Sequence, residues 1–152
     1  MMRAYADSDV LIWHLRGEEK AAKMLRSVAS DESVELWIGA LQRAEVVFFM
    51  RENEIAATRA FLSLFKTAAV TAELVDAGGD LYRRWHPSHG IDVNDAILAA
   101  TALASGGTIY TLNTKHYPMP GVRVQRAWQP RVERSKGAGA TKAGRRGVGT
   151  GR

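Results

Sequence analysis

The sequence predicts a single-domain α/β protein in which helices cover both faces of a short parallel sheet. Short β-like runs alternate with segments of helical periodicity along the chain, and strands separated by helices indicate a sheet of this kind. A length of 152 residues is enough for one hydrophobic core and not for two. The chain has no cysteine, which excludes a disulfide scaffold, a zinc ribbon and a thiol nucleophile.

The N-terminal elements alternate between strand and helix. Residues 3–6 are typical of a short strand, and residues 10–15 have a helical pattern that stops near Gly17. Small and apolar side chains recur at helical spacing over residues 18–28. Residues 34–38 alternate between the two faces of a strand.

Three amphipathic helices are expected next. Residues 41–51 and 54–66 each place apolar side chains on one helical face, and residues 71–85 show the same pattern. A loop that contains Pro87 is expected to follow.

The clearest helix begins at Asp92 and ends at the two glycines of positions 106–107. Asp92 is a good N-cap, and Asp95 lies in the first turn, where the helix dipole favours a negative charge. Residues 108–112 are rich in β-forming side chains, and residues 122–124 are expected to form a last short strand.

The net charge of +5 is unevenly distributed. Residues 131–152 carry seven basic residues and one acid, a net charge of +6, so the rest of the chain sums to −1. The same segment holds six of the fourteen glycines and few large apolar residues, a composition that cannot offset the entropy cost of ordering. We predict a folded domain over residues 1–130 and a basic, disordered tail over 131–152.

Neither a signal peptide nor a membrane span is expected. Asp7 precedes any apolar run of signal-peptide length, and no stretch approaches the ~18 apolar residues of a span. We therefore expect a soluble, cytoplasmic protein with no membrane partner.

Four polar side chains stand out by their position. Asp7 and Asn113 each follow an expected strand, and open α/β sheets bind ligands at the carboxyl ends of their strands. Glu45 and Asp95 are carboxylates on helices that are otherwise apolar. If these acids converge, a divalent cation is the natural counter-charge, and oxygen ligands suit Mg²⁺ or Mn²⁺. Taken singly, each also fits an ordinary turn, cap or surface residue.

Four motifs occur in order along the chain: Tyr5-Ala-Asp-Ser-Asp-Val-Leu-Ile, Arg43-Ala-Glu-Val, Asn94-Asp-Ala-Ile-Leu-Ala-Ala-Thr-Ala-Leu and Tyr110-Thr-Leu-Asn-Thr-Lys-His-Tyr-Pro. Together they resemble the successive motifs of PIN-domain ribonucleases, and most closely those of the VapC-type toxins of bacterial toxin–antitoxin pairs. The resemblance covers about residues 3–125. It implies a three-layer α/β/α sandwich around a short parallel sheet.

The resemblance also implies a Mg²⁺-dependent endoribonuclease with an acidic site. Asp7 and Asp95 match its metal-binding positions. Glu45 matches a helix position that would bind the metal directly or through water, or would orient the attacking water as a base. Asn113 matches a fourth catalytic position that is often Asp, so this chain carries one negative charge fewer there.

Other residues near these positions could support the site. Asp9 or Asp92 could compensate for the missing charge, although Asp9 fits a cap of the helix expected at 10–15 equally well. Hydrogen bonds from the hydroxyl groups of Ser8 and Thr111 could steady the metal ligands.

A cationic stretch precedes the helix that carries Asp95. Arg83, Arg84 and Trp85 could bind phosphates and stack a base of single-stranded RNA. The same residues fit a helix end where arginine suits the dipole and Trp85 packs into the core. For His116 we expect a packing role in a loop and no catalytic one.

Rival functions predict different behaviour. A phosphohydrolase of the haloacid-dehalogenase type would explain Asp-Ser-Asp after a strand, but it needs a Gly-Asp motif, and Gly79-Asp80 lies inside an expected helix. A PIN-fold binding module that contacts nucleic acid or an antitoxin without cleaving RNA would account for Asn113.

The expected partners are an RNA substrate, a cognate antitoxin protein and a second copy of the chain. Val46, Phe48, Phe49 and Met50 exceed what one helix face needs for its own core. They fit a homodimer surface, an antitoxin-binding surface or additional core packing.

Overall fold

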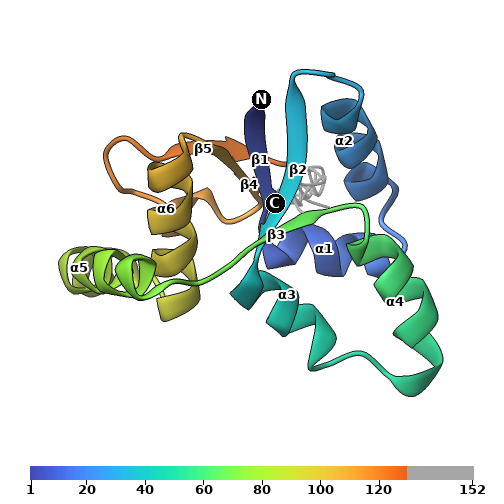
Figure 1. Ribbon diagram of the computed structural model, residues 1–152, viewed down its shortest axis with the longest axis horizontal. Helices are drawn as coiled ribbons and strands as arrows, with labels where there is room; N and C mark the ends of the chain where they lie inside the picture. The colour runs from blue at the N-terminus through green and yellow to red at the C-terminus, as the bar shows by residue number, and fades with distance from the viewer. Residues whose placement is uncertain (130–152) are drawn as a thin grey trace, which may run out of the picture.

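The structure, a computed structural model, describes residues 1–129, and its centre is a five-stranded parallel sheet (Figure 1). The strand order is β3-β2-β1-β4-β5, and every neighbouring pair is parallel. The strands are β1 (Met2–Ala6), β2 (Val34–Gly39), β3 (Lys66–Ala68), β4 (Thr108–Thr111) and β5 (Arg123–Arg126). The predicted tail at 131–152 lies outside the described residues, and the domain boundary near residue 130 stays a prediction.

Helices cover both faces of the sheet. In Figure 1, α5 and α6 lie on one side and α1 to α4 on the other. The helices are α1 (Ser8–Leu15), α2 (Glu19–Ala29), α3 (Ala40–Val47), α4 (Ile55–Leu62), α5 (Ala72–His89) and α6 (Val93–Ser105), with short 3₁₀ turns at Glu52–Glu54 and Thr114–His116. The predicted three-layer α/β/α sandwich is confirmed. Within residues 1–129 no helix is both long and apolar enough to cross a membrane.

Two hydrophobic clusters, one on each face of the sheet, hold the layers together. Tyr5 of β1 packs with Leu98 of α6 and Ile109 of β4 on one face. Ala6, the next residue, belongs to the opposite cluster with Val10 of α1. Consecutive residues of β1 point to opposite faces of the sheet, so this central strand is buried on both sides. Burial on both sides is typical of strands with a nearly continuous apolar sequence, such as the end of β1.

The register places the carboxyl ends of β1 and β4 side by side. Ala6 pairs with Tyr110, and the backbone N–H of Asp7 donates to the Tyr110 carbonyl at 3.0 Å. Thr111 therefore lies next to Asp7 at the same edge of the sheet. This edge is where the sequence predicts a ligand site.

One strand was not predicted. The helix expected at 54–66 ends at Leu62, and residues 66–68 form the edge strand β3. Phe61, Leu62 and Phe65 are buried in the same cluster, so apolar residues keep a helical spacing beyond the end of the helix. Because of this spacing, the sequence predicts one continuous helix and not the turn between α4 and β3.

Two helix boundaries also differ from the prediction. The helix expected at 41–51 ends at Val47. The helix expected at 71–85 continues through Pro87, and Gly90, with φ of 61°, ends it. Proline lacks only one backbone donor, and the loss of a single bond in the last turn leaves the rest of the helix intact.

Two adjacent glycines on α5 allow a test of how closely α5 packs on α6. A Cβ on Gly78 would lie 3.0 Å from Ile97 Cγ1 and 3.3 Å from Ile97 Cα, whereas a Cβ on Gly79 would meet only the Arg83 side chain, at 3.5 Å. Overpacking by Gly78→Val should lower the free energy of unfolding by about 1–3 kcal/mol. Gly79→Val should change it by less than about 0.5 kcal/mol. Urea unfolding curves measure both values, and equal losses would show that α5 and α6 pack more loosely than this.

Candidate active site

Asp7 lies where β1 passes into α1, and it is 7% exposed. It is the N-cap of α1, and its Oδ1 accepts a hydrogen bond from the Ser8 backbone N–H at 2.8 Å. Its Oδ2 accepts from the hydroxyl groups of Thr111 at 3.0 Å and Tyr117 at 2.7 Å. The carboxylate is thus held by three donors from different parts of the chain. Ser8 steadies Asp7 through its backbone N–H, whereas the sequence predicts a hydrogen bond from its hydroxyl group.

Asp95 reaches the same edge from the first turn of α6. It forms a reciprocal capping box with Asp92: the Asp95 N–H donates to Asp92 Oδ1 at 2.7 Å, and the Asp92 N–H donates to Asp95 Oδ2 at 3.0 Å. The other oxygen, Oδ1, lies 3.4 Å from the Tyr117 hydroxyl. Asp92 therefore orients Asp95 through the backbone of the helix start, and one hydroxyl joins Asp95 to Asp7.

Asp9 binds the end of β4. Its Oδ2 accepts from the Leu112 N–H at 2.9 Å and from the Thr111 hydroxyl at 3.2 Å. The expectation that Asp9 caps the first helix is wrong: α1 begins at Ser8, so Asp7 is the cap and Asp9 lies in the first turn. Thr111 bridges the two acids, since its hydroxyl lies within hydrogen-bond distance of both carboxylates.

Sequence reasoning missed Tyr117 and expected a packing role for His116, and both residues contact the site. Tyr117 is 5% exposed, and its hydroxyl contacts both Asp7 and Asp95. His116 Nδ1 lies 3.0 Å from Asp95 Oδ2, so this histidine contacts the acidic site and does not only pack in its loop. The signal was their position in the last of the four motifs, directly after Asn113.

Burial and crowding change the acidity of these groups. Burial, together with the negative charge of Asp9, raises the pKa of Asp7 to about 7. Burial also raises the pKa of Asp95 to about 6 and that of Asp9 above its ordinary value. Among the described residues no lysine or arginine pairs with these three carboxyl groups, so burial disfavours their charged forms.

Glu45 is placed beside this cluster and not inside it. Its Oε1 accepts from the Asn94 side-chain amide at 2.5 Å. Gln42, which is buried, reaches the Asn94 carbonyl at 3.4 Å and ties α3 to the start of α6. A Cβ on Gly39 would overlap the terminal oxygen of the Gln42 side chain, so Gln42 would have to move if another residue replaced this glycine.

The other predicted residues lie at the rim. Asn113 is exposed, and its side chain faces His116, with a nitrogen separation of 3.1 Å. On α5, Arg83 pairs with Asp80, and the Arg84 guanidinium lies 5.2 Å from the Trp85 ring. Trp85 packs against the core cluster that contains Tyr5, as the helix-end interpretation expects.

The acidic site suits a divalent cation held by few protein ligands. Among residues 1–129 no three acidic or histidine side chains converge closely enough to hold a metal ion unaided. One hydroxyl group lies within hydrogen-bond distance of both Asp7 and Asp95, and no lysine or arginine among residues 1–129 forms an ion pair with either of them. Mg²⁺ is commonly bound through one or two carboxylates and keeps several waters, so these two residues fit it.

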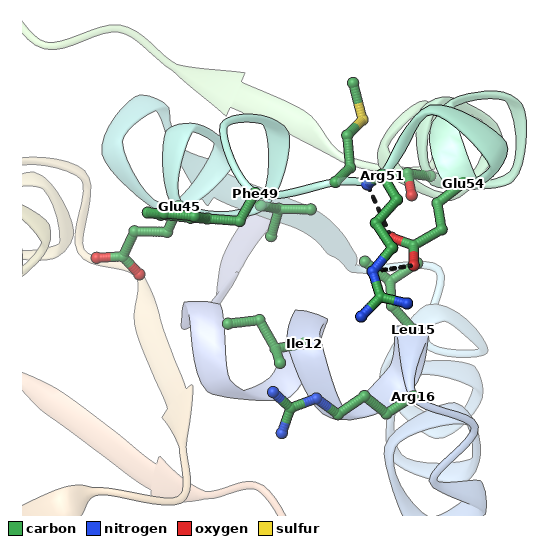
Figure 2. Close-up of a pocket in the computed structure, with 10 residues that line it drawn as sticks. Ile12, Leu15, Arg16, Glu45, Phe49, Arg51 and Glu54 are labelled. Carbon is green, nitrogen blue, oxygen red and sulfur yellow. Dashed lines mark hydrogen bonds and ion pairs between the residues drawn. The ribbon is translucent and has the colours of Figure 1, made fainter.

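A groove of about 610 Å³ lies on the other side of Glu45, between α1, α3 and the start of α4. Figure 2 shows the Glu45 carboxylate directed away from the Arg51–Glu54 pair at the far end of the groove. Phe49 lines the groove and is 83% exposed, and its neighbour Phe48 is 81% exposed. Two adjacent aromatic rings in water are unusual for a surface without a partner.

The PIN-domain family model matches residues 4–121 of the chain. The chain belongs to the PIN-domain family. This PIN domain is 38% identical over 114 residues to Ribonuclease VapC19 of Mycobacterium tuberculosis, an alignment that covers 74% of this chain and 90% of the relative. Ribonuclease VapC10 of the same organism is 37% identical over 114 residues, covering 74% of this chain and 84% of the relative.

Solved structures share the fold of this PIN domain. A toxin–antitoxin complex from Klebsiella pneumoniae matches it with a TM-score of 0.69 and 23% identity, covering 84% of this chain and 99% of that chain. The resemblance that the four motifs predict is therefore confirmed for the family and the fold.

Replacement of Asp7 tests whether its buried carboxylate, when charged, lowers the stability of the folded protein. Because the pKa of Asp7 is raised in the folded protein, its contribution to stability is greatest below about pH 4 and is lost as the pH rises through about 7. In EDTA, Asp7→Asn should raise the melting temperature at pH 8 and have less effect at pH 5. Asp76→Asn, an exposed substitution on α5, is the control. An Asp7→Asn protein that melts lower than wild type at pH 8 would contradict this account.

Proposed function

We propose that this PIN domain is the toxin component of a toxin–antitoxin pair, a Mg²⁺-dependent endoribonuclease that hydrolyses RNA phosphodiester bonds. One observation carries the proposal. Asp7 and Asp95 are distant in the sequence, yet both carboxylates lie within hydrogen-bond distance of the Tyr117 hydroxyl at the carboxyl edge of the sheet. The two Mycobacterium relatives that bear the name ribonuclease support the reaction class. The toxin–antitoxin complex of the same fold supports the biological setting.

Asp7 and Asp95 would hold the metal, and Mn²⁺ could replace Mg²⁺ because both prefer oxygen ligands. When bound, the ion would offset the charge of a phosphate and lower the pKa of a water molecule. Thr111 and Tyr117 fix the orientation of the Asp7 carboxylate. Asp9 would add negative charge from the side of β4, which partly replaces the charge that Asn113 lacks.

Glu45 would accept the proton of the attacking water. Its carboxylate is half-buried and held by Asn94, whose neighbour in the chain is Asp95. A base must lie within hydrogen-bond reach of the water that it activates, and Asn94 keeps Glu45 beside the acidic pair. At the rim, the Asn113 amide could bind a phosphate oxygen or a water molecule.

RNA would approach along the end of α5. Arg83 lines a small groove together with Val93 at the start of α6, and Arg84 is exposed. Both arginines can bind phosphates on the strand that enters the site. Trp85 is half-buried, so only its exposed edge would meet a base.

The cleavage test compares matched carboxylate variants. Purified wild-type protein should cleave single-stranded RNA in Mg²⁺ and stop when EDTA removes the metal. Asp7→Asn and Asp95→Asn should each lower the cleavage rate about 100-fold or more, while Asp76→Asn should leave it unchanged. The rate is measured on an end-labelled RNA.

Two outcomes would contradict the proposal. Equal cleavage by wild type and by Asp7→Asn would show that a contaminant is the nuclease. Retention of RNA by the wild type in a binding assay, without cleavage in Mg²⁺ or Mn²⁺, would favour a PIN-fold binding module.

We further propose that an apolar helix of the cognate antitoxin occupies the groove between α1, α3 and α4. Ile12 and Leu15 of α1 and Val46 of α3 supply an apolar floor, and Phe49 stands exposed at its edge. Arg16 also lines the groove and could pair with an acidic residue of the antitoxin. The expected homodimer would compete for this surface only if it uses the same residues.

Substitution of one phenylalanine tests this surface. Phe49→Ser should weaken antitoxin binding at least about tenfold, because interface aromatic residues carry much of the binding energy. Leu64→Ser is the control, since Leu64 is an apolar residue that is 67% exposed and does not line the groove. Calorimetric titration with the antitoxin measures the affinity. Unchanged antitoxin affinity, with loss of a dimer in light scattering, would assign the groove to a second copy of the chain.

A further inference from the structure

Tyr117 is the only side chain among residues 1–129 whose recorded hydrogen bonds reach both Asp7 and Asp95. It is separated from Asp7 by 110 positions in the sequence and from Asp95 by 22. Its ring packs in the cluster that contains Tyr5 and Ile109. A phenylalanine would fill the same space, so the contribution of tyrosine over phenylalanine lies in its hydroxyl.

The hydroxyl completes a set of donors that surrounds the two carboxylates. Asp7 Oδ2 accepts from Thr111 and Tyr117, on two segments that follow each other at the end of the sheet. Asp95 Oδ2 is fixed by the Asp92 backbone and lies 3.0 Å from His116. Only the Tyr117 hydroxyl contacts an oxygen of each acid, so it alone couples their orientations.

We propose that Tyr117 is a positioning residue whose hydroxyl sets the relative orientation of the Asp7 and Asp95 carboxylates so that one divalent cation binds both. This inference rests on the proposed function, because it concerns the metal site of that function. Donors that orient metal-binding carboxylates typically change metal affinity 10- to 100-fold when they are removed.

Two other roles would give different results. A hydroxyl that only satisfies a buried group would affect stability and leave metal affinity unchanged. A hydroxyl that occupies the position of the cation would compete with it, and its removal would tighten metal binding. Metal affinity therefore separates these roles from positioning, whereas activity at one metal concentration would not.

The experiment uses two Tyr→Phe variants of the full chain. Tyr117→Phe removes the hydroxyl at the acidic site. Tyr5→Phe removes a buried hydroxyl that contacts Ser105 at 2.8 Å, at a place with no contact to either acid. Both substitutions keep the aromatic ring and should allow folding. The readout is the melting temperature as a function of MgCl₂ concentration, which reports binding to the folded state.

We expect Tyr117→Phe to raise the half-saturating MgCl₂ concentration about tenfold and Tyr5→Phe to leave it unchanged. RNA cleavage by Tyr117→Phe should recover at high MgCl₂, because the reacting groups remain in place. If the half-saturating MgCl₂ concentration of Tyr117→Phe equals or is lower than that of the wild type, the positioning role of Tyr117 is wrong, and the proposed metal site is unaffected. A wild-type protein whose melting temperature does not respond to MgCl₂ or MnCl₂ would overturn the metal site and, with it, this inference.

Discussion

The burial of three carboxyl groups at one edge of the sheet is the constraint on which the arrangement of this site depends. Asp7, Asp9 and Asp95 are largely buried, and burial raises the pKa of each of them. Such a cluster persists only if its oxygens find donors in the protein. Thr111 and Tyr117 supply hydroxyl groups, and backbone N–H groups supply the remainder. The chain therefore holds three carboxyl groups at a place where burial disfavours their charged forms and a bound cation would favour them.

The capping roles of Asp7 and Asp95 coincide with the metal-binding roles that we propose for them. Asp7 caps α1, and Asp95 completes a capping box with Asp92 at the start of α6. A cap fixes the carboxylate at a helix N-terminus, and the helix in turn is fixed by its packing on the sheet. The ordinary reading of each acid as a turn or cap residue is therefore correct, and it is also the means by which two distant segments present their oxygens to one place.

Local patterns in the sequence predict most of the fold, because each strand and helix is built from neighbours in the chain. The strand before Asp7 and the helix after Asp92 follow from such patterns. The edge strand at 66–68 did not, because apolar residues continue at helical spacing past the end of α4. Tyr117 was missed for a different reason. Its contact with Asp7 spans 110 positions of the sequence, so no pattern of neighbouring residues predicts it. The four motifs placed Glu45 near the site, but its bond to Asn94 emerges only from the packing of α3 against α6.

The distribution of charge explains why an acidic site can serve an anionic substrate. Residues 131–152 carry a net charge of +6, and the rest of the chain sums to −1. Basic residues attract RNA without selecting a bond to break. In the proposed function, the charged forms of Asp7 and Asp95 would repel a phosphate until a cation offsets their charge, so affinity for RNA at this edge would depend on the metal. Arg83 and Arg84 are exposed on α5 and form no ion pair with Asp7 or Asp95, so in the proposed function they would hold flanking phosphates without neutralising the acids. This separation matters, because an arginine placed among the acids would satisfy them permanently and would remove the demand for a cation.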